Sequence, residues 1–278
     1  MQTNFISGDF LNGGINNFVF VKSILILNLT FISYFKVKHM KLKLTLVLTL
    51  FFACNLVAQE LKPAPEGITA ESVINDYINA IGGLAKLNKV NSISTWAKTE
   101  MQGQEIRITS HSARGNKFYQ EIGTPDMTFQ KQICNGQKAY IIAGGQRAEI
   151  TGEAFENLKF EAELFREAKY KELGVSLELL GIEKVNDKEA YKIKCSLASG
   201  YEFVEYYDTE TKYKVRTENQ MKTQEGKVTI ISDFGDYRNV KGVFYPYTLK
   251  QEIGPQLIDM VVTLIQINKA KASVFEVE

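Results

Sequence analysis

The sequence has very little histidine and cysteine, with two His and three Cys among its 278 residues. Zinc sites and the Ser-His-Asp or Cys-His groups of hydrolases draw mainly on these residues, so such chemistry is poorly supplied. Five Pro and 20 Gly argue against a collagen-like or proline-rich disordered chain. The 33 Lys and Arg are balanced by 32 Asp and Glu, unlike the basic surplus of a nucleic-acid binder. We therefore expect no nucleic-acid partner, no metal and no cofactor.

Residues 40–58 have the three parts of a secretory signal peptide. Lys41 and Lys43 form a short basic start, residues 44–54 are largely apolar, and Ala58 is a small residue at the cleavage position. The 11 residues of the apolar run are too few to span a bilayer comfortably. We expect export to the periplasm with cleavage after Ala58.

Residues 1–39 precede this complete signal peptide. The simplest interpretation is that translation starts at Met40 and that the upstream segment is a mis-annotated or unstructured extension. The alternative is a membrane hairpin, with residues 18–35 as one span and residues 44–58 as the other. Without residues 1–58 the chain keeps 28 basic and 31 acidic residues, a net charge of −3. Residues 59–278 carry no linker or repeat, so we expect a single domain, and a monomer.

The three cysteines have different expected roles. A small residue precedes Cys54, as in lipid-modified cysteines, so a lipid anchor at Cys54 is an alternative to signal-peptide cleavage. Cys134 and Cys195 belong to the exported part, where a disulfide is chemically allowed. Alternation puts Cys195 on an apolar face but Cys134 on a face shared with Gln130 and Gln132. We therefore expect two separate thiols.

Helical periodicity is confined to a few segments. Thr69 can cap a helix over residues 69–81, which ends at the Gly82-Gly83 pair, and a short turn over residues 84–90 follows. A second amphipathic pattern covers residues 152–165.

Period-two alternation dominates the rest of the chain, which indicates half-buried antiparallel strands. The alternating segments are residues 104–113, 188–197, 213–218, 228–234 and 243–249, and the turn signals between strands are Asn135-Gly136, Gly144-Gly145, Asn186-Asp187, Ser199-Gly200 and Glu225-Gly226. In the segment 213–218, Tyr213, Val215 and Thr217 are expected to face away from Lys214 and Arg216. Residues 257–267 are apolar on both parities, which predicts a strand that is either central in the sheet or covered on both faces. The pattern predicts an α+β fold of about ten strands, with helices on one side of a large antiparallel sheet.

Several short motifs, in this order, resemble landmarks of an outer-membrane lipoprotein-sorting-like family of exported proteins from Bacteroidetes-type bacteria. They are residues 74–83 with Lys86, Leu87 and Val90, then residues 116–118, 135–140, 188–193, 232–234 and 243–246. The resemblance spans essentially the whole mature chain. It implies the LolA/LolB-like fold, an incomplete antiparallel β-barrel whose helices lid a concave face that takes acyl chains. No residue here matches the gating arginine of the carrier, and a LolB-type receptor would require modification of Cys54.

A wide sheet with few helices leaves an apolar hollow, which in a watery compartment suits a lipid. The candidates for lining this hollow are Tyr191, Ile193, Tyr245, Tyr247, Leu249, Val262 and Leu264. The alternative is that these side chains form a filled core.

The functional hypothesis is a carrier or chaperone for a lipid or lipoprotein acyl group in the cell envelope. The alternative is a non-catalytic periplasmic scaffold or interaction module that binds an envelope protein. We expect no enzyme, because His111, the only histidine of the mature chain, lies with Arg107 and Thr109 on the polar side of a strand.

Overall fold

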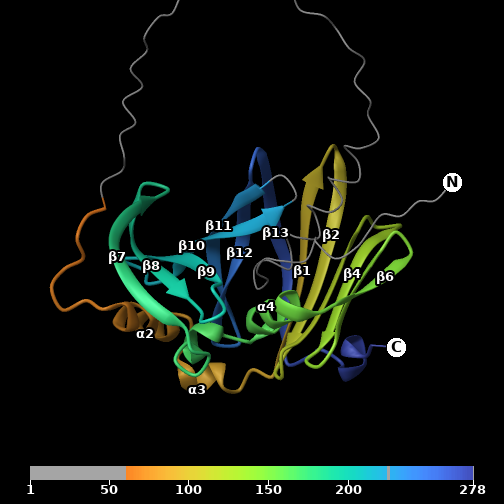
Figure 1. Ribbon diagram of the computed structural model, residues 1–278, viewed down its shortest axis with the longest axis horizontal. Helices are drawn as coiled ribbons and strands as arrows, with labels where there is room; N and C mark the ends of the chain where they lie inside the picture. Colours follow the sequence, from red (N-terminus) through yellow and green to blue (C-terminus); the bar gives the residue numbers. More distant parts are fainter. Residues whose placement is uncertain (1–60, 224–225, 278) are drawn as a thin grey trace, which may run out of the picture.

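In a computed structural model, which describes residues 61–223 and 226–277, the chain forms one antiparallel sheet of 13 strands. The strand order is β6-β5-β4-β3-β2-β1-β13-β12-β11-β10-β9-β8-β7, so β6 and β7 are the two edges and the sheet is not closed. The sheet is strongly curved, so that β7–β9 and β1–β6 stand on opposite sides of the molecule with α4 between them (Figure 1). The predicted signal peptide, the segment upstream of it, the membrane hairpin, Cys54 and part of the Glu225-Gly226 turn lie outside the described residues.

The bounds of the strands are β1 Ser92–Met101, β2 Gln104–Ala113, β3 Lys117–Gly123, β4 Thr128–Asn135, β5 Ala139–Ala143, β6 Gln146–Ile150, β7 Ser176–Val185, β8 Lys188–Ser196, β9 Glu202–Asp208, β10 Lys214–Thr223, β11 Gly226–Val240, β12 Val243–Ile253 and β13 Gln256–Ile267. The helices are α2 Ala70–Ala80, α3 Leu84–Leu87 and α4 Gly152–Ala162, with 3₁₀ turns η1 Arg166–Lys169 and η2 Ala272–Phe275. In the part of the chain that the structure describes, no helix has the length and apolarity to cross a membrane.

The predicted α+β fold and the first helix are confirmed. Thr69 caps α2 through a capping box, in which its hydroxyl accepts from the backbone N–H of Ser72 at 3.1 Å. The strand count of about ten is too low. The outermost hairpin is hard to recognise, because β5 and β6 have five residues each and neither alternates between buried and exposed positions. Without a period of two, nothing in the hydrophobic pattern marks such short strands.

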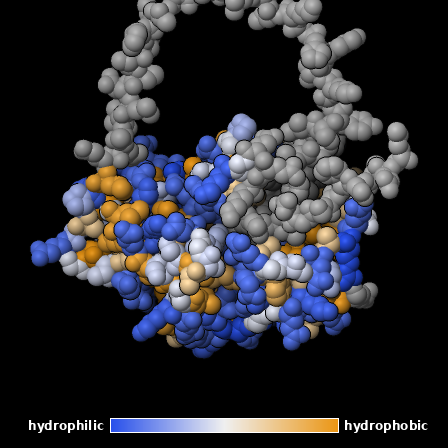
Figure 2. All heavy atoms as spheres, in the orientation of Figure 1, coloured by the Kyte–Doolittle hydropathy of each residue, from blue (hydrophilic) through white to orange (hydrophobic). Residues whose placement is uncertain are grey.

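Two large apolar clusters form most of the interior, with a small third cluster around Ala190. One joins β2–β5 and α4 to β11–β13 around Ile108, Leu158 and Met260, and the other joins α2 and η1 to β8 and β9 around Tyr77, Ile193 and Tyr207. The surface in the view of Figure 2 is mainly hydrophilic, with apolar residues in smaller groups.

The last strand is central in the sheet, as predicted, because β13 lies between β1 and β12. The other alternative, a strand covered on both faces, does not apply. Leu257, Val261 and Leu264 are exposed, with 59%, 48% and 45% of their surface accessible. Only one face of β13 packs against the interior, so apolarity on both parities is not a sign of two buried faces here.

The junction of α2 with β12 depends on a glycine. Gly82 has φ +137°, and a Cβ there would come within 2.7 Å of the Gly242 carbonyl oxygen. We expect Gly82→Ala to lower the free energy of unfolding by about 3 kcal/mol, because backbone strain and a backbone clash add. Gly83→Ala is the matched control, since Gly83 also has a positive φ but open space around it, and should cost about 1 kcal/mol. Urea denaturation measures both, and equal losses would contradict the assignment of the close approach.

Candidate functional site

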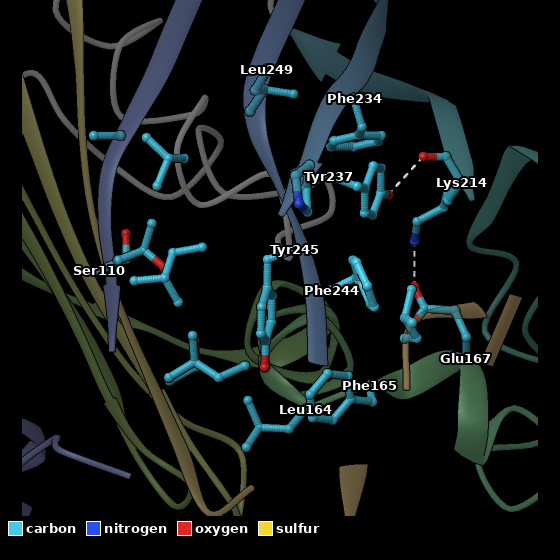
Figure 3. A pocket seen from close by; sticks show the side chains of 18 of the residues that line it. Ser110, Leu164, Phe165, Glu167, Lys214, Phe234, Tyr237, Phe244, Tyr245 and Leu249 are labelled. Atoms are coloured by element: carbon cyan, nitrogen blue, oxygen red, sulfur yellow. Dashed lines mark hydrogen bonds and ion pairs between the residues drawn. The ribbon is translucent and has the colours of Figure 1, made fainter. Parts of the chain in front are cut away.

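A cavity of about 210 Å³ lies on the inner face of the sheet, between its central strands and the helical segments. Its walls come from α2, from β1–β3 and from β10–β13, and residues 163–167, here called the lid segment, close it on the side of α4 and η1. Figure 3 shows Tyr245 in the middle of this space, pointing towards Leu164 and Phe165 of the lid segment. The cavity therefore lies between the two apolar clusters rather than inside either of them.

The cavity is lined mainly by apolar and aromatic side chains. They are Tyr77, Ile81, Ile93, Ala97, Phe118, Leu164, Phe165, Phe234, Tyr237, Phe244, Tyr245, Pro246, Leu249, Met260, Val262 and Ile265, with Thr95, Ser110, Ser112, Glu163, Arg166, Glu167, Lys214 and Thr248 as the polar members. A mainly apolar surface with a smaller number of polar groups is the usual composition of a site for an apolar ligand.

Three of the seven residues proposed from the sequence line this cavity. They are Tyr245, Leu249 and Val262, which lie on the neighbouring strands β12 and β13. Tyr191 and Ile193 are on the inner face but are packed in the cluster around α2, with exposed fractions of 8% and 0%. For these two residues the alternative of a filled core is correct.

Tyr247 and Leu264 are not part of the cavity lining, and each stands at an irregularity in the pairing of its strand. Leu264 pairs with Trp96 and Val262 with Ala97, so Thr263 is an extra residue that turns Leu264 outwards. In β11, Asp236 has φ +51° and is skipped in the pairing with β12 next to Tyr247. Arg238 lies 4.5 Å from the ring of Tyr247.

Sequence reasoning missed the lid segment and the charged groups beside it. Lys214 was expected to face away from Thr217, yet both are buried, at 3% and 2% exposure. The register of β10 shifts between Lys214 and Arg216, which makes Val215 a bulge residue and turns Lys214 inwards. The amphipathic pattern over residues 152–165 continues past the end of α4 at Ala162, so it does not separate the helix from the lid segment.

Five charged side chains form a buried ion cluster next to the lid segment. Arg166 pairs with Glu161 and lies 3.4 Å from Glu205 through Nη2, and Lys214 pairs with Glu167 and lies 3.1 Å from Glu205 through Nζ. The ion cluster connects the lid segment and α4 to β9 and β10. Buried charges are stable only when paired in this way.

Hydroxyl groups complete the coordination of the ion cluster. Tyr207 donates to Glu205 at 2.5 Å and Tyr201 donates to Glu161 at 2.9 Å. Asn219 in turn donates to the hydroxyl oxygen of Tyr201 at 3.3 Å. Together these bonds fix the position of the lid segment over the cavity.

Backbone strain and ring contacts also determine the conformation of the lid segment. Phe165 has φ +52° and ψ +48°, a left-handed conformation that is unusual for a bulky side chain. Its ring packs 6.2 Å from the ring of Tyr245, across the cavity end. Strained residues persist where the surrounding structure determines them, and they are frequent at ligand sites.

The hydroxyl of Tyr245 is buried and has no hydrogen-bond partner among the described residues. Burial raises the pKa of this hydroxyl above its ordinary value, so it stays a donor at neutral pH. The Nε atom of Arg166, a buried donor of another residue that lines the cavity, also has no partner in the described part of the chain.

The ion cluster predicts an acid-sensitive contribution to stability. Burial alone raises the pKa of the Glu205 carboxyl, but Lys214, Arg166 and the Tyr207 hydroxyl together hold it below its ordinary value of 4.5. Because this pKa is lower in the folded state, the stabilisation is complete above about pH 4.5 and is lost as the pH falls through the folded value. We expect the difference in urea midpoint between wild type and Glu205→Gln to be large at pH 7 and to shrink below pH 4.5. A difference in urea midpoint that does not change with pH would contradict a stabilising role for the charge of Glu205.

A second hollow of about 370 Å³ lies near α4 and the strands β8–β11. Although it is larger, its lining includes Glu153, Lys194, Glu202, Glu218 and Lys227. Charged side chains from both sides make it unsuitable for an apolar chain. The smaller cavity is therefore the candidate lipid site.

The two cysteines of the described region are free and buried, in different apolar clusters, which confirms the expected separate thiols. The reasoning for Cys134 was only partly correct, because Gln130 and Gln132 on its face are also buried. His111 is half-buried and contacts Ser94. Within residues 61–223 and 226–277, no group of three His, Cys, Asp or Glu could hold a metal ion.

The sequence matches no protein-family model and no curated protein. The fold is similar to those of solved structures of low sequence identity. A DUF1329 family protein from Desulfovibrio piger aligns with a TM-score of 0.51 at 11% identity, over 74% of this chain and 97% of that chain. A LolA superfamily protein from Nitrosomonas europaea aligns with a TM-score of 0.51 at 12% identity, over 75% of this chain and 98% of that chain. The curved open sheet with its helical cover is therefore a LolA-like fold, as the sequence resemblance predicted.

Proposed function

We propose that this protein is an exported carrier or chaperone that holds a lipid or lipoprotein acyl group in the bacterial cell envelope. The observation that carries the proposal is the cavity of about 210 Å³ between the lid segment and strands β1, β12 and β13, with Phe118, Leu249 and Met260 in its wall. The LolA-like fold supports the same function by analogy of architecture.

The size of the cavity suggests what it holds. An apolar protein cavity of about 150 Å³ accepts benzene, so 210 Å³ is room for roughly eight carbons of one acyl chain. At ~0.8 kcal/mol for each buried methylene, such a chain gains about 6 kcal/mol before the costs of association. This corresponds to a dissociation constant no tighter than on the order of 10⁻⁵ M from the chain alone. A weak and reversible complex suits a carrier that must release its ligand.

The test uses the full chain, expressed with its N-terminal segment and purified without detergent from the envelope fraction. Native mass spectrometry should show protein with one bound lipid. After removal of the lipid, the neutral fluorescent probe N-phenyl-1-naphthylamine should bind at a single saturable site. Bare protein in the mass spectrum together with no probe binding would contradict the carrier function.

The alternative of a non-catalytic scaffold has its own supporting observation. The outer face of β13 exposes Leu257, Val261 and Leu264, and such apolar surface is common where a protein partner binds. In that case the protein would co-purify with an envelope protein and without lipid, which the same preparation reveals.

A further inference from the structure

The two ends of the cavity differ in chemistry. Phe118, Leu249 and Met260 belong to the apolar cluster around α4 and form one end. The lid segment and Lys214 form the other, where Figure 3 shows Lys214 bonded to Glu167 beside Phe244. Contact with charged groups gives an acyl chain no favourable free energy of burial. Its methyl end therefore belongs at the apolar end of the cavity and its head at the lid end.

The cations at the lid end already have carboxylate partners. Arg166 is bonded to Glu161 and Glu205, and Lys214 to Glu167 and Glu205. In addition, Lys169 is bonded to Glu163, which lines the same end.

Taken together, this part of the described chain holds three cations and four carboxylates, a net charge of −1. A ligand carboxylate or phosphate would therefore meet net negative charge and no free cation. In a buried site that repulsion is weakly screened.

The unpartnered polar groups at this end have a common character. The hydroxyl of Tyr245 and Nε of Arg166 are both buried donors. Arg166 is 4% exposed, so its Nε–H cannot turn to bulk solvent. An uncharged acceptor, such as the carbonyl oxygen of an ester or amide, would satisfy a donor here without adding negative charge.

We propose that the cavity selects acyl chains whose head is an uncharged ester or amide, with its carbonyl oxygen accepting from Tyr245, and excludes free fatty acids and phosphate heads from the lid end. This inference rests on the proposed function and specifies its ligand. It distinguishes acylated molecules, whose carboxyl group is already esterified or amidated, from the free acids of the same chain length.

The experiment is a displacement titration of N-phenyl-1-naphthylamine from the lipid-free full-length protein at pH 8. Methyl laurate and sodium laurate have the same chain and differ in the charge of the head. We expect laurate to displace the probe with at least about tenfold lower affinity than the ester, because the carboxylate of laurate would enter a site of net negative charge.

Tyr245→Phe removes the donor and keeps the ring. It should weaken methyl laurate binding about three- to tenfold, the usual range for one hydrogen bond, and should weaken binding of the probe, which has no carbonyl oxygen, by less. Tyr247→Phe is the matched control, because Tyr247 is on the same strand but outside the cavity lining, and it should change neither affinity.

Equal or tighter binding of laurate would overturn the selectivity while leaving the carrier function intact. An unchanged ester affinity in Tyr245→Phe would remove Tyr245 from the head site. If the wild-type protein binds neither the probe nor either lipid, the carrier proposal fails and the selectivity fails with it.

Discussion

We expect Val262→Trp to reduce the affinity for N-phenyl-1-naphthylamine and for methyl laurate by at least about tenfold. Val262 lines the cavity from β13 and is partly buried, so a larger side chain there extends into the space that the ligand needs. Loss of room for about four methylenes removes about 3 kcal/mol of burial, which is roughly a hundredfold in affinity. Probe fluorescence titration of the lipid-free protein measures the effect.

Val261→Trp is the control for this variant. Val261 precedes Val262 in the same strand, but its side chain is 48% exposed on the outer face. Both variants should unfold within about 1 kcal/mol of wild type, because neither forces a ring into a filled core. Normal binding by a folded Val262→Trp protein would show that the ligand lies elsewhere, and loss in both variants would point to a general disturbance of β13.

The sequence was most informative where local chemistry decides the structure. The cap at Thr69 and the stop at Gly82-Gly83 are local signals, and α2 spans Ala70–Ala80. The alternation between residues 104 and 113 predicts β2 with the correct ends. In these segments each side chain reports its own surroundings, so no long-range contact is needed to interpret the pattern.

The candidate site was predicted less well, because it depends on where the strands depart from regular alternation. One extra residue at Thr263 is enough to turn Leu264 away from the cavity, and Tyr247 stands opposite the left-handed Asp236, where the pairing of β11 with β12 is interrupted. A bulge leaves no clear mark in hydrophobicity, since its position is set by pairing with a strand that is distant in the sequence. Trp96, the partner of Leu264, is such a distant residue.

Buried charges were the other reason why the candidate site was predicted less well. Lys214 and Arg166 are ordinary surface residues by type, and Lys and Arg are almost never fully buried unless paired. Their partner Glu205 is 39 residues from Arg166 and on a different strand from Lys214. Only the three-dimensional arrangement brings these groups together, so no pattern along the chain could have predicted the polar end of the cavity.

The second large effect concerns this ion cluster: we expect Lys214→Met to lower the free energy of unfolding by about 3–5 kcal/mol. The substitution leaves Glu167 without its cation and Glu205 with Arg166 alone, and a buried charge that has lost its partner carries the full cost of desolvation. Urea denaturation at pH 7 measures the loss. Lys98→Met is the control, because the Lys98–Glu105 pair is exposed, and its urea midpoint should stay near that of wild type.

A double variant separates stability from selectivity. Glu167→Leu together with Lys214→Met removes one charge of each sign, so the lid end keeps its net charge of −1. Replacing a buried ion pair by apolar side chains is often neutral or stabilising, and we expect the double variant to recover most of the loss. Its preference for methyl laurate over laurate should persist, because that preference depends on the net charge and on Tyr245 rather than on Lys214. A double variant as unstable as Lys214→Met would mean that Glu205 requires Lys214 itself, and that Arg166 and Tyr207 do not compensate for its loss.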